Sequence, residues 1–279
     1  MASTMLQAPA AASGPAAAAG YRPANFADAV LSEWTKIRTL RSTFFTLAAT
    51  VVFVVGLGAL ISYEGSVHYT AQDGLWDPTS ISLSGLVIGQ LTIAVLGVLA
   101  MTGEYSTGMV RTSLAAVPRR GRLLAAKAAV FGAVALATGE LVSWVAFFVG
   151  QLLISGHQPT ASLSQPDVAR AVIGGGLYIA LIGLMAVAAG TILRYTAAAI
   201  TAVIAVLFVL PGVLEALPTS WRLPVEKYWP TRAGEQILMV TRDANTLPAW
   251  LGFGELALFV AVLFALGYFL LQRRDAGGK

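Results

Sequence analysis

Long runs of apolar residues, separated by short polar stretches, make up most of the chain. A run of about 20 residues is enough to cross the hydrocarbon core of a bilayer as a helix. Such runs fall at residues 43–62, 81–101, 125–154, 171–193, 197–217 and 248–271. The pattern predicts an all-α membrane protein, with six transmembrane helices in one domain over residues 42–271. Pro211 and Gly212 predict a kink near the end of the fifth helix.

A different pattern precedes the first run. Asn25 can cap a helix that has Asp28 in its first turn. The apolar residues of this segment then share one face: Phe26, Val30, Trp34 and Ile37. We expect residues 25–41 to form an amphipathic helix in the membrane interface; the alternative is a basic stop that only anchors the first span. Residues 1–24, rich in Ala, Pro and Gly, are expected to be a disordered cytoplasmic tail, and residues 272–279 a second tail.

The composition agrees with a membrane protein. The chain has 279 residues, of which 57% are hydrophobic and 11% charged, and its mean hydropathy is +0.73. An ordinary soluble domain has about 25% charged residues. The net charge of +4 does not indicate nucleic-acid binding, because the basic residues lie at the ends of apolar runs. The chain has no cysteine, which excludes disulfides and thiol chemistry.

The distribution of basic residues predicts an orientation. Of the 18 Lys and Arg residues, 13 fall on one side of a six-span layout and five on the other. The positive-inside rule places the richer side in the cytoplasm, so both termini are expected there, in a multi-pass protein of the plasma membrane. The connection 218–247 then lies outside. Because it is long and mildly apolar, we expect it to fold onto the membrane surface or dip back into it.

The sequence offers little for enzymatic chemistry. Its two histidines, His68 and His157, both fall in predicted outer loops, and no H-E-x-x-H or carboxylate pair accompanies them. No G-x-x-x-x-G-K-[ST] segment is present to hold the phosphates of ATP. We therefore expect no catalytic residue, no metal site and no cofactor bound by this chain.

Two carboxylates lie within predicted spans, Glu140 near the middle of the third and Glu255 in the outer half of the sixth. A charge at membrane depth is costly and usually faces a wet cavity or the bundle interior, so each is a candidate for a substrate or proton pathway. Both can instead be hydrogen-bonded packing residues.

The longest basic stretch lies between the second and third spans, at residues 102–127. Its basic residues are Arg111, Arg119, Arg120, Arg122 and Lys127, against the single carboxylate Glu104. Within it, Val110, Leu114 and Val117 are spaced as one face of a helix that ends at Pro118. The spacing predicts a short docking helix over residues 107–117. The alternative is a solvated basic loop whose charges only enforce the topology.

Two motifs resemble bacterial type 2 ATP-binding-cassette exporter permeases. In the loop, the matching positions are Gly103, Glu104, Tyr105, Gly108, Arg111, Leu114, Pro118, Arg119, Arg120, Ala126 and Lys127. Before the first span, they are Glu33, Trp34, Lys36, Arg38, Arg41 and Ser42. With the six-span layout, the likeness covers nearly the whole chain after Phe26. The tail before Tyr21 belongs to no family motif.

The resemblance implies the membrane subunit of an exporter for a small molecule, peptide or lipid-like substrate. Such a permease works as a homodimer or heterodimer and is driven by a separate ATPase that binds ATP and Mg. The loop helix would be the cytoplasmic coupling helix that docks on the ATPase, with the N-terminal interfacial helix beside it. Two other functions stay open: an ATP-independent, proton-coupled carrier or channel using Glu140, and a structural or sensory membrane protein that recruits a partner through the basic loop.

Overall fold

The computed structural model describes residues 25–70, 75–109 and 119–274, and within these ranges the chain forms helices and no strand. Six helical segments are long and apolar enough to cross a membrane: Arg41–His68, Pro78–Ser106, Arg120–Ile154, Val168–Leu193, Thr196–Leu214 and Ala249–Arg273. They match the six runs expected from the sequence. The prediction of an all-α fold with six spans is confirmed, and the chain is a multi-pass membrane protein.

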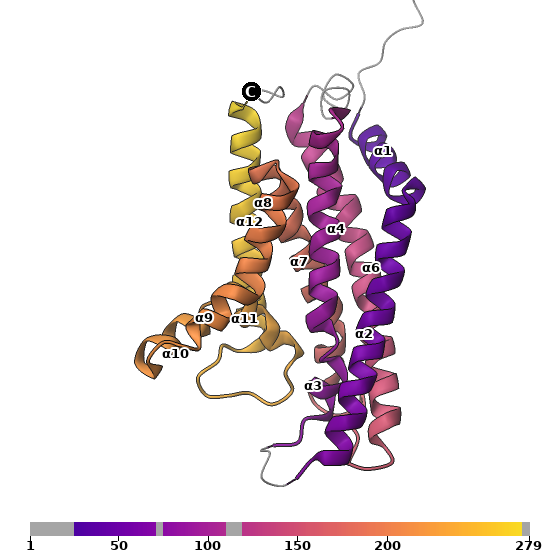
Figure 1. Cartoon of the computed structure of the whole chain (residues 1–279), viewed down its shortest axis with the longest axis vertical. Coiled ribbons are helices and arrows are strands. Elements are labelled where there is room, and N and C mark those ends of the chain that lie inside the picture. The colour runs from indigo at the N-terminus through magenta and orange to yellow at the C-terminus, as the bar shows by residue number, and fades with distance from the viewer. Residues whose placement is uncertain (1–24, 71–74, 110–118, 275–279) are drawn as a thin grey trace, which may run out of the picture.

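Several spans consist of more than one helix. The bounds are α1 (Phe26–Thr39), α2 (Arg41–His68), α3 (Pro78–Leu83), α4 (Leu86–Ser106), α6 (Arg120–Ile154), α7 (Val168–Leu193), α8 (Thr196–Ile204), η1 (Ala205–Val209), α9 (Leu210–Leu214), α10 (Thr219–Lys227), α11 (Pro230–Glu235), η2 (Gln236–Leu238) and α12 (Ala249–Arg273). In Figure 1, α1 and the C-terminal end of α12 lie at the upper end of the bundle, and α3 and α10 at the lower end. The connection 110–118, outside the described residues, joins the upper ends of α4 and α6.

The N-terminal helix begins as the sequence predicts. The Asn25 side chain accepts a hydrogen bond from the Asp28 amide at 2.8 Å, and the Asp28 carboxylate accepts one from the Asn25 amide at 2.8 Å. This capping box satisfies two amide groups that the first turn leaves without helical partners. Helix α1 crosses the end of the bundle obliquely (Figure 1) and leaves Phe26, Leu31 and Trp34 exposed.

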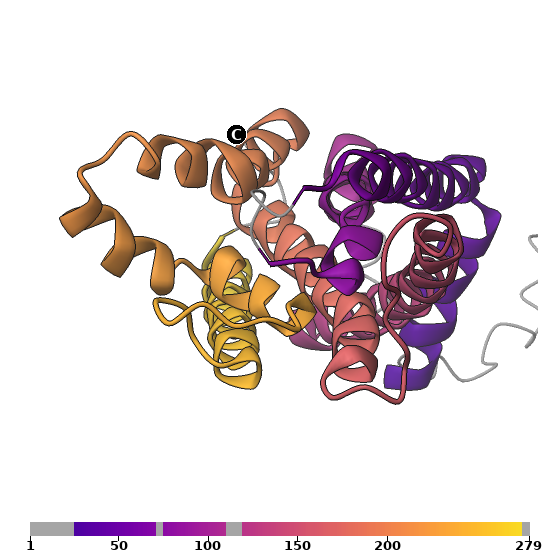
Figure 2. The ribbon, with the colours of Figure 1, turned by 90° about the horizontal axis from the view of Figure 1, so that it is seen from below.

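Helix α7 is the centre of the bundle. It packs against α4 and α6 on one side and α12 on the other, and Figure 2 shows it between two groups of helices. Glycines allow the close approach: a Cβ at Gly97 of α4 would lie 2.6 Å from the Gly183 carbonyl oxygen, and one at Gly139 of α6 2.8 Å from that of Gly176. Small residues at such contacts are what helix packing in lipid favours.

The fifth span changes its helical register where the sequence predicts a kink. Over η1 the chain forms a π-helix, in which the Leu210 amide bonds to the Ala205 carbonyl. The next bond in that register would join residue 211 to Val206, but Pro211 has no N–H. The Trp229 indole N–H donates to the Val206 oxygen at 3.0 Å instead. A side chain from the following connection therefore satisfies the carbonyl that the proline leaves without a donor.

The connection 218–247 is folded rather than extended. Helix α11 packs against α12, and η2 packs against both α7 and α12. Seen from below in Figure 2, α9, α10 and α11 form an arch beside the bundle. Ile237 is fully buried at the contact with α7. The segment thus belongs to the packed structure at this end of the molecule.

Candidate functional site

Four charged side chains from three helices meet beside the ends of the 102–127 stretch. The Lys127 ammonium of α6 lies 2.6 Å from Glu33 Oε2 of α1 and 2.7 Å from Glu104 Oε1 of α4. The Lys36 ammonium of α1 lies 2.6 Å from Glu33 Oε1 and 2.7 Å from the same Glu104 oxygen. Positive and negative groups alternate around a closed ring. We call these four residues the ionic cluster.

The local sequence explains how α1 comes close enough to take part. Ala29 of α1 and Ala126 of α6 are both buried and pack together, with Val30 beside them. Glu33 lies one turn after Ala29 on the same side of α1, so its carboxylate points into the protein rather than to the membrane interface. The Lys127 ammonium also donates to the Ala100 carbonyl at 3.0 Å, one turn before Glu104.

The ionic cluster is largely buried, and its two negative charges are balanced by two positive charges. The side chains of Glu33, Glu104 and Lys127 are 3%, 8% and 5% exposed, and only Lys36, at 24%, reaches solvent. Burial alone would lower the pKa of the Lys36 ammonium, but its hydrogen bonds to Glu104 and Glu33, with their negative charges, outweigh burial and raise that pKa above its ordinary value. Each charge is stabilised by two others, so removing one leaves its two buried neighbours to share a single partner of opposite charge.

A second set of contacts joins the end of α4 to the turn between α7 and α8. The Arg194 guanidinium lies 5.3 Å from the centroid of the Tyr105 ring, within the range of a cation–π contact. Arg194 has φ of 62°, a left-handed conformation that turns the chain sharply between two spans. Beside it, Thr196 donates to the Thr102 hydroxyl at 2.9 Å.

The start of α6 is joined to the C-terminal end of α12. One Arg120 nitrogen donates to the carbonyls of Leu271 at 2.5 Å and Arg274 at 2.8 Å. The last carbonyls of a helix have no partner within it, and a guanidinium satisfies them favourably. Arg274 in turn donates to the Ile192 carbonyl of α7 at 2.9 Å. The basic loop is thus flanked by residues that contact α1 on one side and α12 on the other.

The residues expected to couple to an ATPase divide into four groups. Glu104, Tyr105 and Arg120 make the contacts described above. Gly103 lies in the last turn of α4, and Gly108, with φ of 72°, ends that helix in the left-handed conformation typical of a glycine at this position. Arg119 is exposed beside the loop. Arg111, Leu114, Pro118 and nearly all of the predicted coupling helix over residues 107–117 lie outside the described residues.

The residues expected in the interfacial helix divide into two groups. Glu33 and Lys36 join the ionic cluster, whereas Trp34, Arg38 and Arg41 are exposed. The sequence motif contained the four members of the cluster without indicating that they meet, because they are separated by up to 94 positions. The available signal was an acidic residue, Glu33, placed beside the apolar face of the amphipathic helix.

The two carboxylates expected on a pathway are not brought together by any hydrogen bond or ion pair. Glu140 accepts a hydrogen bond from the Trp144 indole at 3.2 Å and lies against Gly176 of α7, where a Cβ would overlap its carboxyl group. Glu255 is partly exposed on α12 and has no hydrogen bond within residues 25–70, 75–109 and 119–274. For Glu140 these contacts are those of a packing residue.

A buried polar chain at the other end of the bundle was not expected from the sequence. The Tyr178 hydroxyl of α7 lies 2.8 Å from Gln90 Oε1 of α4 and 3.3 Å from Glu235 Oε1 of α11. The other Glu235 oxygen lies 3.6 Å from Arg232. Gln90 and Tyr178 stand out as polar residues within apolar runs, which is a usable signal. Nothing in the sequence showed that Glu235 would fold back onto them.

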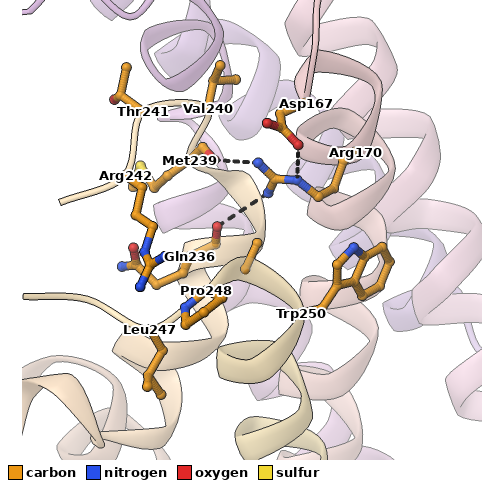
Figure 3. Close-up of a pocket in the computed structure, with 11 residues that line it drawn as sticks. Asp167, Arg170, Gln236, Met239, Val240, Thr241, Arg242, Leu247, Pro248 and Trp250 are labelled. Atoms are coloured by element: carbon orange, nitrogen blue, oxygen red, sulfur yellow. Dashed lines mark hydrogen bonds and ion pairs between the residues drawn. The ribbon is translucent and has the colours of Figure 1, made fainter. Parts of the chain in front are cut away.

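The same connection is held to the bundle by Arg170 (Figure 3). The Arg170 guanidinium donates to the Ile237 carbonyl at 2.8 Å. Figure 3 shows its hydrogen bond to the Met239 carbonyl, at 2.9 Å, and its Nε facing Asp167 Oδ1, at 3.0 Å. Asp167, Arg170 and Met239 line a cavity of about 260 Å³ that also borders Trp250. Because Arg170 is already satisfied by protein oxygens, its role is to clamp the connection onto α7.

Among the described residues, no three His, Asp or Glu side chains converge on a point where a metal ion could bind. Comparisons of the sequence with models of known protein families and with curated proteins find no match. The membrane spans, the two polar sites and the sequence motifs are therefore the features from which a function can be inferred.

Proposed function

We propose that this chain is the membrane subunit of an ATP-driven exporter of the type 2 ATP-binding-cassette class. The observation that carries the proposal is the ionic cluster. It joins the interfacial helix α1 to α4 and α6, whose ends flank the loop that resembles a coupling element of that class. A loop that only enforced topology would need basic residues but no buried ionic connection to its neighbours.

The geometry gives a route by which a force on the loop reaches the spans. The ionic cluster makes α1 and the adjoining ends of α4 and α6 one unit, because shifting any of them alone would separate buried charges. Arg120 extends the contact to α12, and Arg194 extends it to the turn between α7 and α8. A partner that pushes on the loop would therefore act on most of the bundle rather than on one helix.

The remaining parts of the proposal follow from the sequence. ATP and Mg would be bound by the partner ATPase, since this chain has no phosphate-binding motif. The active form would be a homodimer or heterodimer, and the basic ends of the helices would face the cytoplasm. The substrate would be a small molecule, a peptide or a lipid-like compound moved out of the cell.

Co-purification and ATP hydrolysis test the proposal. The chain should be expressed with an ATP-binding-cassette ATPase from the same genome, reconstituted in proteoliposomes, and assayed for hydrolysis. Arg111→Glu and Arg119→Ala should lower both association and hydrolysis, because both residues belong to the proposed docking loop. Arg242→Ala is the matched control, since Arg242 is an exposed arginine of the connection 218–247, far along the chain from the loop. Equal association and hydrolysis for all three variants and the wild type would remove the loop from the mechanism.

A further inference from the structure

At the centre of the polar chain near the connection 218–247, the hydroxyl proton of Tyr178 faces two hydrogen-bond acceptors. Tyr178 has a single hydroxyl proton, and the carboxamide oxygen of Gln90 and a carboxylate oxygen of Glu235 both lie within hydrogen-bond distance of its oxygen. The hydroxyl can donate to only one of them at a time. The group left over must then donate to the tyrosine oxygen or go without a partner.

Burial makes that choice energetically important. Tyr178 is 1% exposed and Gln90 is 2% exposed, so water cannot replace a missing hydrogen bond at either residue. Glu235 lies at the border, with 19% of its side chain exposed. Its neighbours Arg232 and Gln236 line a cavity of about 310 Å³, whereas Glu235 is not among the residues that line it. The Glu235 carboxyl group therefore contacts a buried hydroxyl and keeps a partly exposed side that water can reach.

The charges that face Glu235 are few and only partly compensate it. Arg232 lies 3.6 Å away on the same helix and is shared with Glu215, which lies 3.6 Å from another of its nitrogens. From α7 the only titratable neighbour is Tyr178, because the guanidinium of Arg170 is bound to backbone carbonyls and Asp167. The wall of the cavity adds acidic and basic side chains of both signs, Glu226, Lys227 and Asp243.

The last neighbouring element contributes no charge to this site. Helix α12 presents Gly252 and Leu256 to α11, where they contact Ala233 and Gly234. The carboxyl group of Glu255 on the same helix makes no ion pair with the described residues. Glu235 is thus a largely buried carboxyl group whose one neighbouring cation, Arg232, is shared with Glu215.

We propose that Glu235, Tyr178 and Gln90 form a proton-binding site, in which the Glu235 carboxylate takes up a proton from water at its exposed side and the Tyr178 hydroxyl changes its hydrogen-bond acceptor in response. When Glu235 is ionised, Tyr178 donates to it, and the Gln90 amide turns to donate to the tyrosine oxygen. When a proton has bound to a Glu235 oxygen, the new O–H donates to the tyrosine oxygen, and Tyr178 donates to the Gln90 carbonyl. Each state satisfies all three groups, and the only transfer is one proton between water and carboxylate.

The electrostatics agree with this assignment. Burial raises the pKa of Glu235 above its ordinary value of 4.5, and the Arg232 charge and the Tyr178 hydrogen bond offset only part of that effect. Proton binding in α11 is thereby linked to the hydrogen bonding of two buried residues of α4 and α7. The inference does not depend on the exporter proposal, because it requires no partner and no substrate.

The test is a pH titration of the purified full chain in detergent, followed by the infrared C=O band of protonated carboxyl groups. Glu235→Gln should remove one titrating component. Tyr178→Phe should move that component to higher pH, because the ionised form loses its donor. Gln90→Leu should move it to lower pH, because Tyr178 then has Glu235 as its only acceptor. Glu64→Gln, which removes an exposed glutamate of α2 that makes no contact with Tyr178 or Gln90, should leave the component where it is.

The opposite signs separate a proton site from a structural cluster. If Tyr178→Phe and Gln90→Leu move the component in the same direction, or if Glu235→Gln leaves it in place, the proposal is wrong. Should Glu235→Gln fail to fold, as judged by gel filtration, the other two variants still decide the matter. The measurement uses neither ATP nor an ATPase. The proton-site proposal can therefore fail while the exporter proposal holds, and the exporter proposal can fail while the proton-site proposal holds.

Discussion

The two ends of the molecule both contain buried charges, but they handle them differently. At the loop end, two carboxylates face two ammonium groups at 2.6 to 2.7 Å, and the set is electrically balanced. At the other end, Glu235 faces an arginine at 3.6 Å and a tyrosine with another acceptor. A balanced cluster is suited to joining helices rigidly, whereas an incompletely compensated carboxyl group is suited to changing its state.

The largest effect is expected from unbalancing the ionic cluster. Lys127→Met leaves Glu33 and Glu104 with only Lys36, and we expect a loss of about 3 to 5 kcal/mol in the free energy of unfolding. Glu33→Met combined with Lys127→Met removes one charge of each sign and leaves the Lys36–Glu104 pair, so the double variant should lose much less. Thermal unfolding in detergent compares the wild type, the two single variants and the double variant. A double variant that loses the sum of the two single losses would show that the charges do not act as a set.

The same cycle needs a control at an exposed pair. Glu64 and His68 lie 3.3 Å apart on α2, with side chains that are 56% and 74% exposed. Glu64→Gln should change stability by less than about 1 kcal/mol, as exposed pairs generally do.

A smaller effect is expected from releasing the clamp at the other end. Arg170→Ala removes the donors to the carbonyls of Ile237 and Met239. We expect a total loss of about 1.5 to 3 kcal/mol in the free energy of unfolding, because water from the neighbouring cavity can replace part of the lost hydrogen bonding. The loss should appear as faster amide hydrogen exchange in residues 236–248, with little change in α4 or α6. A uniform increase in amide exchange across the whole protein would contradict a local clamp. Arg242→Ala is the control substitution of another arginine.

The hydrogen bond at the break in the fifth span should contribute less again. Trp229→Phe keeps an aromatic ring but removes the N–H that satisfies the Val206 carbonyl next to Pro211. We expect a loss of about 1 kcal/mol, the usual range for a neutral hydrogen bond. Combining it with Pro211→Ala, which restores a backbone N–H for that carbonyl, should recover part of the loss; no recovery would mean that the indole acts by packing alone.

The pH dependence of stability should differ between the two ends. Because the pKa of Glu235 is raised in the folded protein, its favourable contribution is complete below its ordinary value of 4.5 and is lost as pH rises through the folded value. Glu235→Gln should therefore flatten the stability curve above pH 4.5. The pKa of Lys36 is also raised in the folded protein, so its favourable contribution to stability is present below pH 10.5 and is lost as the pH rises above that value. A flat wild-type curve just above pH 4.5 would contradict the first effect.

Much of the fold could be predicted from the sequence, because spans depend on composition over 20 residues and not on single contacts. The cap at Asn25 and the irregularity at Pro211 were predictable for the same local reason. The ionic cluster was not, since Glu33, Glu104 and Lys127 meet only when α1 packs on α6 through Ala29 and Ala126. The position of Glu235 was equally hidden, because the fold of the connection 218–247 depends on long-range contacts to α7 and α12.

The most direct test of the exporter proposal is the ATP hydrolysis rate of the partner ATPase in proteoliposomes, measured with and without this chain. We predict that the chain changes the hydrolysis rate, that Arg111→Glu abolishes this change, and that Arg242→Ala preserves it. A hydrolysis rate that is the same with the chain, without it and with either variant would contradict the proposal that this protein is the membrane half of an ATP-driven exporter.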